Sequence, residues 1–176
     1  MKTSHFLERA GQITFIVMCA VVTAVGIKYL GSTERVEAAP PAPYAPGASL
    51  PGIAKLNPQG AAGILVLGLS NRCRFCTESM EFYRRIAAHP KVSSADLQIS
   101  VVSVEPERPM REYLSRQALN VSVVVPMLDI GFTMSGTPTL VLADGAGKVV
   151  ASWEGLLDAE REQDVLRRVA DVLDRR

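Results

Sequence analysis

The pair Cys73 and Cys76 constrains the fold of this chain more than any other feature, because of its position in the sequence. An apolar run of strand length, 64–69, precedes the pair, and a segment with helical spacing, 77–88, follows it. The sequence therefore predicts a buried strand that delivers two cysteines, three residues apart, to the first turn of a helix. This is the geometry of a dithiol redox centre in an α/β domain.

The two cysteines have different predicted roles. The first turn of a helix has unpaired backbone N–H groups and the positive end of the helix dipole, so it favours an anion. Cys73 lies there and is the predicted attacking thiolate. Cys76 lies one turn later and points further into the domain, where it can resolve a mixed disulfide.

Two other interpretations of the pair have less support. A zinc site needs about four ligands, but the remaining candidates are Cys19, inside an apolar run, and His5 and His89, which lack ligand spacing. A purely structural disulfide across so short a loop would constrain the unfolded chain little. We therefore predict a redox pair and no metal site.

Apolar periodicity predicts the other elements of the domain. Strands alternate with helices at first, and a hairpin with a turn at 144–147 and a last helix follow, which indicates a mixed parallel and antiparallel sheet flanked by helices. Residues 126–135 are expected to form a loop. The predicted strands are 64–69, 97–104, 121–125, 139–143 and 149–153, and the predicted helices are 77–88, 109–119 and one from 159.

The N-terminal part of the chain has a different character. Residues 13–27 carry no charge, and with 28–30 they reach the length that just spans a bilayer, about 18 residues. A cleaved signal peptide is the alternative, although the small-residue stretch 36–39 lies further from the apolar run than cleavage sites usually do. We predict a cytoplasmic tail at 1–12, a transmembrane signal-anchor at 13–30, a Pro/Ala-rich linker at 31–59 and a domain at 60–176.

Six of the eleven prolines lie in residues 31–59, and a stretch so rich in proline tends to extend as a spacer. Within it, only residues 50–56 are candidates for packing on the domain surface. Lys2 and Arg9 before the span are matched by Lys28 and Arg35 after it, so the positive-inside rule does not fix the orientation. The short tail before a large domain favours a cytoplasmic N-terminus and an extracytoplasmic domain.

The overall composition excludes several classes of protein. A formal net charge of +1 and 48% hydrophobic residues fit neither a nucleic-acid-binding protein nor a disordered one. The 117 residues from 60 onward suffice for one hydrophobic core.

A second motif, Gly136-Thr-Pro-Thr139, follows the cysteine pair by about sixty residues and leads into a predicted strand. With Cys73-Arg-Phe-Cys76, it makes residues 60–175 resemble the thioredoxin-like family, most closely the membrane-anchored thiol:disulfide oxidoreductases of the TlpA and ResA type. The resemblance implies a thioredoxin-like fold behind a transmembrane helix. It also implies that Pro138 is cis, lies beside the disulfide and shapes a substrate groove with Thr137.

The sequence departs from that family near the motif. Asn71-Arg72 stands where the family commonly has a tryptophan, and the predicted first strand has no acidic residue to accept a proton from Cys76. Ser79 stands where some relatives carry a glutamate. Arg72 and Arg74 flank Cys73 and are either surface residues without a role or charges that stabilise its thiolate.

Together these features predict an extracytoplasmic thiol:disulfide oxidoreductase anchored in the cytoplasmic membrane of a bacterium and facing the periplasm. Protein thiols and disulfides are the expected substrates, a membrane electron donor the expected partner, and no bound cofactor is needed because the dithiol itself carries two electrons. A peroxide-reducing redoxin and a copper-handling module are the alternatives. Copper would need a histidine or methionine beside the cysteines, for which Met127 and Met134 are the nearby candidates.

Overall fold

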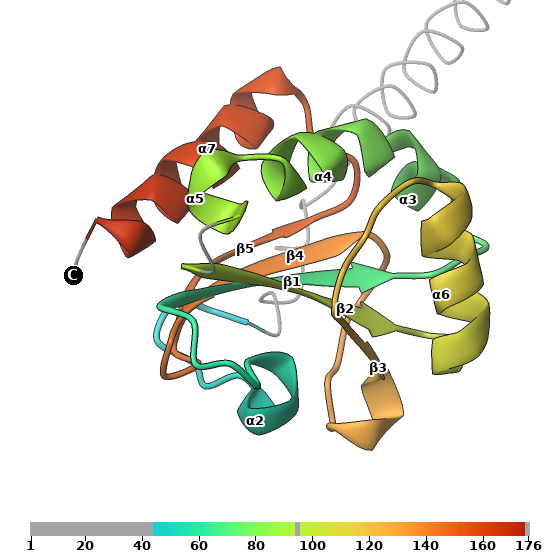
Figure 1. Cartoon of the computed structure of the whole chain (residues 1–176), viewed down its shortest axis with the longest axis horizontal. Helices are drawn as coiled ribbons and strands as arrows, with labels where there is room; N and C mark the ends of the chain where they lie inside the picture. The colour runs from blue at the N-terminus through green and yellow to red at the C-terminus, as the bar shows by residue number, and fades with distance from the viewer. Residues whose placement is uncertain (1–43, 94–95, 175–176) are drawn as a thin grey trace, which may run out of the picture. The chain divides into compact units, whose positions relative to one another are not determined.

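The computed structural model describes residues 44–93 and 96–174. A five-stranded sheet with the strand order β3-β2-β1-β4-β5 forms its centre (Figure 1). β1, β2 and β3 are parallel, whereas β4 is antiparallel to β1 and β5 is antiparallel to β4. The strands are β1 (Gly63–Leu69), β2 (Leu97–Ser103), β3 (Val123–Pro126), β4 (Thr139–Asp144) and β5 (Val149–Glu154).

Helices and a short helical turn connect and cover these strands. α2 lies on one face of the sheet, and α4, α5 and α7 lie on the other (Figure 1). The elements are α2 (Ile53–Leu56), α3 (Arg74–Glu78), α4 (Met80–Ala87), α5 (Pro90–Ser93), α6 (Glu107–Arg116), the 3-10 helix η1 (Met127–Asp129) and α7 (Ala159–Leu173). The predicted α/β class with a mixed sheet is confirmed.

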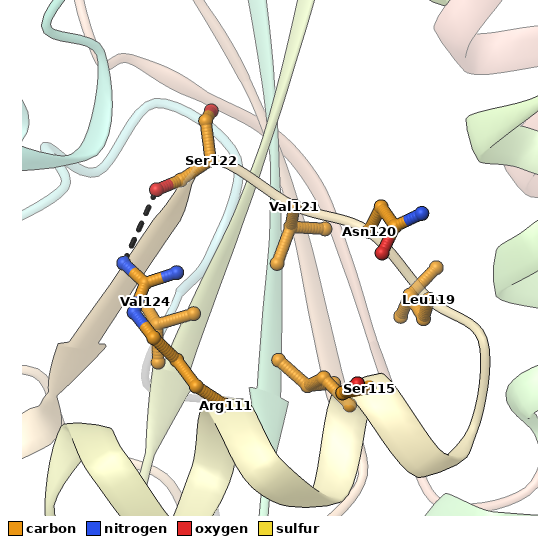
Figure 2. Close-up of a pocket in the computed structure, with 8 residues that line it drawn as sticks. Arg111, Ser115, Leu119, Asn120, Val121, Ser122 and Val124 are labelled. Atoms are coloured by element: carbon orange, nitrogen blue, oxygen red, sulfur yellow. Dashed lines mark hydrogen bonds between the residues drawn. The ribbon is translucent and has the colours of Figure 1, made fainter.

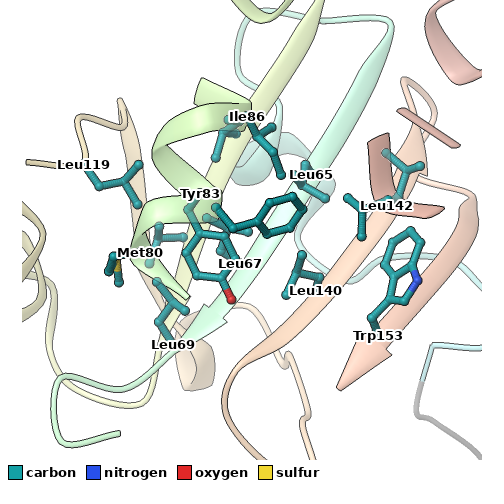
Figure 3. Close-up of a cluster of buried hydrophobic side chains, with 14 of the residues drawn as sticks. Leu65, Leu67, Leu69, Met80, Tyr83, Ile86, Leu119, Leu140, Leu142 and Trp153 are labelled. Atoms are coloured by element: carbon teal, nitrogen blue, oxygen red, sulfur yellow. The ribbon is translucent and has the colours of Figure 1, made fainter. Parts of the chain in front are cut away.

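The central strand β1 divides the core into two clusters because all seven of its residues are buried. Alternate side chains of a strand point to opposite faces. Leu65, Leu67 and Leu69 pack in one cluster with side chains from α4, α6 and α7. Figure 3 shows the three leucines together with the α4 side chains. Ile64 and Val66 belong to the cluster on the other face. The apolar run that the sequence shows at 64–69 is therefore a strand buried on both sides.

Two helices differ from their predicted bounds. The helix predicted at 77–88 is two helices, α3 and α4, which meet at Ser79. The Ser79 hydroxyl donates a hydrogen bond of 2.8 Å to the Phe75 carbonyl, and such back-bonding often bends helices. The helix predicted at 109–119 begins earlier and ends at Arg116, because Ala118 has a left-handed φ of 51°. The loop predicted at 126–135 contains only η1.

Residues 44–56, which we call the strap, pack against the sheet. Tyr44, Leu50 and Leu56 are buried in the second cluster. The strap also extends the sheet beyond β5, since Gly47 N–H donates to the Val149 carbonyl at 2.8 Å and Leu50 N–H donates to the Gly147 carbonyl at 2.8 Å.

The predicted boundary between linker and domain at residue 60 is therefore wrong. The high proline content of 31–59 indicates a spacer, but three large apolar side chains in the strap have a sheet edge and a core to pack on. The domain already includes residue 44.

The predicted tail and transmembrane segment, 1–12 and 13–30, lie outside the described residues. Within 44–93 and 96–174, no helix is long and apolar enough to cross a membrane.

Candidate active site

The two cysteines lie where β1 ends and α3 begins. Cys73 is the N-cap of α3, and its sulfur accepts a hydrogen bond of 3.1 Å from the backbone N–H of Cys76. The same thiol donates to the Thr137 carbonyl at 3.2 Å. Cys73 is partly exposed, Cys76 is fully buried, and both are free thiols. The structure therefore places one accessible and one inaccessible sulfur side by side.

The surroundings separate the acidities of the two thiols. Burial raises the pKa of Cys73, but hydrogen bonds from the Cys76 thiol, from Thr137 and from the first backbone N–H groups of α3 outweigh it, so the pKa is below that of an ordinary cysteine. Burial, together with the hydrogen bond to Cys73, raises the pKa of Cys76 to about 12. At neutral pH Cys73 is thus the better nucleophile and Cys76 holds its proton.

The second motif lies directly against the first. The Thr137–Pro138 peptide bond is cis, as predicted, and the Pro138 carbonyl accepts a hydrogen bond of 2.8 Å from Gly155 N–H. Thr139 fixes the turn from inside, because its hydroxyl donates to the Gly136 carbonyl at 2.7 Å. Within the described part of the chain, the Thr137 N–H has no hydrogen-bond partner. This donor is therefore available beside Cys73.

The two flanking arginines are exposed. Arg74 forms an ion pair with Glu78, with Nε and Oε1 2.6 Å apart, on the outer side of α3. The effects that lower the pKa of Cys73 are hydrogen bonds. A role for Arg72 and Arg74 in tuning the thiolate stays a prediction.

Two tyrosines that the sequence analysis did not select lie near the cysteines. Tyr83 of α4 is buried among Leu67, Leu69 and Leu140 (Figure 3), and its hydroxyl has no hydrogen-bond partner among the described residues. Burial raises the pKa of Tyr83, and the nearby cysteines contribute to the rise. Tyr113 of α6 exchanges a hydrogen bond of 3.0 Å with Thr77, one residue after Cys76. In the sequence, the place of each tyrosine in the apolar pattern of its own helix predicts only a core residue.

A carboxylate and a hydroxyl hold the loop before Cys73, and the sequence analysis missed both. Glu105, just beyond β2, accepts hydrogen bonds from the Ser70 hydroxyl at 2.7 Å and from Asn71 N–H at 3.2 Å. A search for an acid within the first strand could not find it, because Glu105 comes from the neighbouring strand. β1 pairs with β2 in parallel up to Leu69 and Ser103, so Ser70 and Glu105 follow the same end of two neighbouring strands. This pairing could have pointed to Glu105.

The described residues offer little support for a copper site. Met127 and Met134 both pack against the cluster on the face of the sheet opposite the one that holds Cys76. No group of three or more His, Cys, Asp or Glu side chains in 44–93 and 96–174 is arranged to hold a metal ion.

A separate pocket of about 280 Å³ lies between α6 and the start of β3 (Figure 2). Arg111 crosses one side of it and donates to the Ser122 carbonyl at 3.3 Å. The guanidinium is also paired with Glu107, so its charge is compensated. None of the residues that line this pocket belongs to the cysteine site.

Comparison with solved structures identifies the fold. A thiol:disulfide interchange protein from a Bacteroides species has a TM-score of 0.57 and 18% sequence identity, over 70% of this chain and 90% of its own. The thioredoxin domain of a thiol-disulfide oxidoreductase from Bacteroides vulgatus has a TM-score of 0.53 and 16% identity, over 71% of this chain and 97% of its own. No protein-family model and no curated protein matches the sequence.

The chain therefore has a mixed α/β fold of the thioredoxin-like type, with a central sheet flanked by helices. Its two closely spaced cysteines form a CxxC pair at the end of β1.

Proposed function

We propose that this protein is a thiol:disulfide oxidoreductase that acts through Cys73 and Cys76. One observation carries the proposal. The Cys73 sulfur lies at the N-terminus of α3, 3.1 Å from the Cys76 N–H and 3.2 Å from the carbonyl that precedes the cis proline. An accessible sulfur with a lowered pKa, next to a buried one with a raised pKa, has the properties of an attacking and a resolving thiol.

In the reducing direction, the Cys73 thiolate attacks one sulfur of a substrate disulfide. The substrate S–S bond breaks, a mixed disulfide with Cys73 forms, and the other substrate sulfur leaves as a thiolate that is protonated by solvent, while Cys76 gives up its proton to solvent only when it attacks. Cys76 then attacks the Cys73 sulfur, and the second substrate sulfur leaves and is protonated by solvent. Two electrons have moved from the dithiol to the substrate. The oxidising direction reverses the same steps, and the redox partner sets the direction.

The cis-proline turn supports the binding of an extended peptide next to Cys73. Thr137 N–H has no partner among the described residues, and a proline has no N–H that could compete with it. A substrate segment can therefore add to this turn through main-chain hydrogen bonds, as peptides add to the exposed edges of sheets. We assign the substrate groove to Thr137 and Pro138. Arg72, in the loop after β1, and Arg74, at the start of α3, are exposed and are proposed to favour the thiolate.

We further propose that residues 13–30 anchor the protein in the cytoplasmic membrane as a TlpA/ResA-type redoxin and that the domain lies in the periplasm. The uncharged run at 13–27, which with 28–30 is long enough to span a bilayer, supports the anchor. Exported proteins with thiols or disulfides are then the substrates, and a membrane redox protein restores the dithiol. No further cofactor is required, since the cysteine pair carries the electrons.

Insulin reduction by the full-length chain tests the activity. In the presence of dithiothreitol, the wild-type chain should accelerate the precipitation of the reduced insulin chains, and Cys73→Ser should lose this effect. The Glu112→Gln variant on the outer face of α6 is the matched control and should retain it. Binding of one equivalent of copper(I) that is lost on Met134→Ala would instead support a copper-handling module. Consumption of hydrogen peroxide without insulin reduction would support a peroxide-reducing redoxin.

A further inference from the structure

The loop that leads from β1 to Cys73 is held by one carboxylate, Glu105, which lies just beyond the end of the neighbouring strand β2. Glu105 Oε1 accepts the Ser70 hydroxyl proton at 2.7 Å, and Oε2 accepts the Asn71 N–H at 3.2 Å. Hydrogen bonds to a charged acceptor are about twice as strong as those between neutral groups. Both carboxylate oxygens of Glu105 thus accept hydrogen bonds, from two consecutive residues of this loop.

Ser70 is connected to both cysteines. Its carbonyl accepts the Cys73 N–H at 3.2 Å, and its hydroxyl accepts the Arg72 N–H at 3.2 Å while it donates to Glu105. The backbone N–H of Ser70 also acts to lower the pKa of Cys76, although burial outweighs it. The position of this one serine therefore affects the turn that presents Cys73 to α3.

We propose that Glu105 is a positioning residue of the dithiol, which acts through Ser70 to hold Cys73 at the start of α3. The inference rests on the proposed function and deepens it. Glu105 takes no proton in the reaction. It fixes the loop so that the hydrogen bonds that favour each thiolate are already formed before substrate binds.

A simple charge effect of Glu105 would have the opposite sign. A carboxylate near a thiolate repels it and raises the pKa of the thiol, so removal of that charge alone would lower the pKa of Cys73. Loss of positioning instead weakens the hydrogen bonds to the Cys73 sulfur and therefore raises the pKa of Cys73. The other titratable side chains around the sulfurs are Tyr83 of α4 and Tyr113 of α6, and all variants below retain them.

The test compares Glu105→Gln, Ser70→Ala and the double variant in the full-length chain. Glu105→Gln removes the charge and one acceptor, whereas Ser70→Ala breaks the same contact and keeps the charge. We expect both variants to move the midpoint of the pH profile of Cys73 alkylation upward by about half to one pH unit, the size of one hydrogen bond. The equilibrium with glutathione should move about two- to tenfold toward the disulfide, since the reduced form loses stabilisation.

The double variant should shift the midpoint no further than the larger single one, because both changes break one connected set of contacts. Glu112→Gln, which removes a carboxylate that pairs with Arg108 on the surface of α6, should leave the midpoint unchanged. A downward shift in Glu105→Gln, an unchanged midpoint in Ser70→Ala or additive shifts would overturn the proposal. Near-ultraviolet circular dichroism of Trp153 checks that each variant is folded.

These measurements are independent of enzymatic activity. If the wild-type chain fails to reduce insulin but the alkylation midpoints shift as expected, the proposed function fails and the role of Glu105 stands. If insulin is reduced and the alkylation midpoints do not move, the proposed function stands and the positioning role of Glu105 fails.

Discussion

At the scale of single residues, the site depends on a difference between two identical side chains three positions apart. Cys73 caps a helix and meets hydrogen-bond donors and solvent, whereas Cys76 lies in the core with Leu69 and Met80. The first environment lowers the pKa of a thiol and the second raises it. The acidity of each cysteine follows from its environment rather than from the motif itself.

The first prediction concerns the reactivity of the two thiols. With limiting iodoacetamide, the reduced full-length chain should be labelled at Cys73, and the rate should rise with pH through a midpoint below that of an ordinary cysteine, because the pKa of Cys73 is lowered. Cys76 should stay unlabelled up to about pH 10, since its pKa is raised to about 12. Peptide mapping by mass spectrometry measures both. Preferential labelling of Cys76 would show that the assigned roles are wrong.

The second prediction concerns the order of attack and resolution. Cys76→Ser should accumulate mixed disulfides with partner proteins, because Cys73 still attacks and nothing resolves the product. Cys73→Ser should accumulate few, since Cys76 is fully buried. Non-reducing electrophoresis of the two variants gives the comparison. Equal trapping in both would contradict the proposed sequence of steps.

The sequence predicted the cysteine pair as the candidate site and the proline that is cis, but not the residues that orient them. Cys73, Cys76 and Pro138 belong to short motifs with a fixed chemistry, so single-sequence reasoning could find them. Ser70 and Glu105 belong to no motif, and their contact depends on the pairing of β1 with β2. Such partners are brought together by tertiary structure, which local patterns do not encode.

At the scale of elements, the sequence predicted the strands better than the helix ends and the strap. Each strand shows a run or an alternation of apolar residues, whereas the break at Ser79 coincides with one side-chain hydrogen bond, to Phe75. The strap has few local signals, because its three apolar anchors are separated by prolines and glycines. Its packing is fixed by the edge of β5 and by Gly147, whose left-handed φ of 82° lets the backbone approach Ile53.

The third prediction compares two glycines with similar backbone conformations. Gly147 and Gly131 both have left-handed φ values, 82° and 68°, so alanine at either costs about 1 kcal/mol in backbone strain. An added Cβ at Gly147 would also lie 2.9 Å from Ile53 Cδ1, whereas at Gly131 it would meet nothing within 4 Å. Gly147→Ala should therefore lower the free energy of unfolding by at least about 1 kcal/mol more than Gly131→Ala. Urea denaturation measures the difference, and equal losses would mean that the strap does not pack as described.

At the scale of the whole molecule, the strap is part of the folded unit. Tyr44 stacks on Phe132 with ring centroids 4.6 Å apart, and its hydroxyl accepts the Thr133 N–H at 3.0 Å. Residues 132–134 lead to the cis-proline turn. The start of the domain is thereby connected to the loop that shapes the proposed substrate groove.

The fourth prediction concerns where the chain can be shortened. A chain of residues 44–176 keeps the buried side chains of Tyr44, Leu50 and Leu56, whereas a chain of residues 60–176 loses all three. Since burial of one such side chain contributes about 1.5–3 kcal/mol, the shorter chain should lose about 5 kcal/mol, a large part of the stability of an ordinary domain. Urea denaturation of both measures this loss. Equal stability of the two chains would mean that the domain begins at residue 60, as the sequence predicted.

The fifth prediction concerns the topology proposed for the N-terminal segment. Alkaline phosphatase fused after Arg176 should be active, because this reporter needs export, and β-galactosidase at the same place should be inactive. Fusions to a chain that lacks residues 13–30 should give the opposite pair of results. If the full-length fusions instead give inactive alkaline phosphatase and active β-galactosidase, the domain lies in the cytoplasm and a membrane electron donor is no longer implied.

The position of the strap limits how far the redox centre can reach from a membrane. Only residues 31–43 separate the predicted span from the folded unit, and thirteen residues extend at most about 45 Å, where 29 residues would have extended about 100 Å. If residues 13–30 anchor the protein as proposed, the start of the domain stays within that height above the bilayer, and a redox protein in the same membrane would have to present its own cysteines within that height plus the width of the domain. The roughly halved tether length also concentrates the two partners in a thinner layer, which raises the frequency of their encounters.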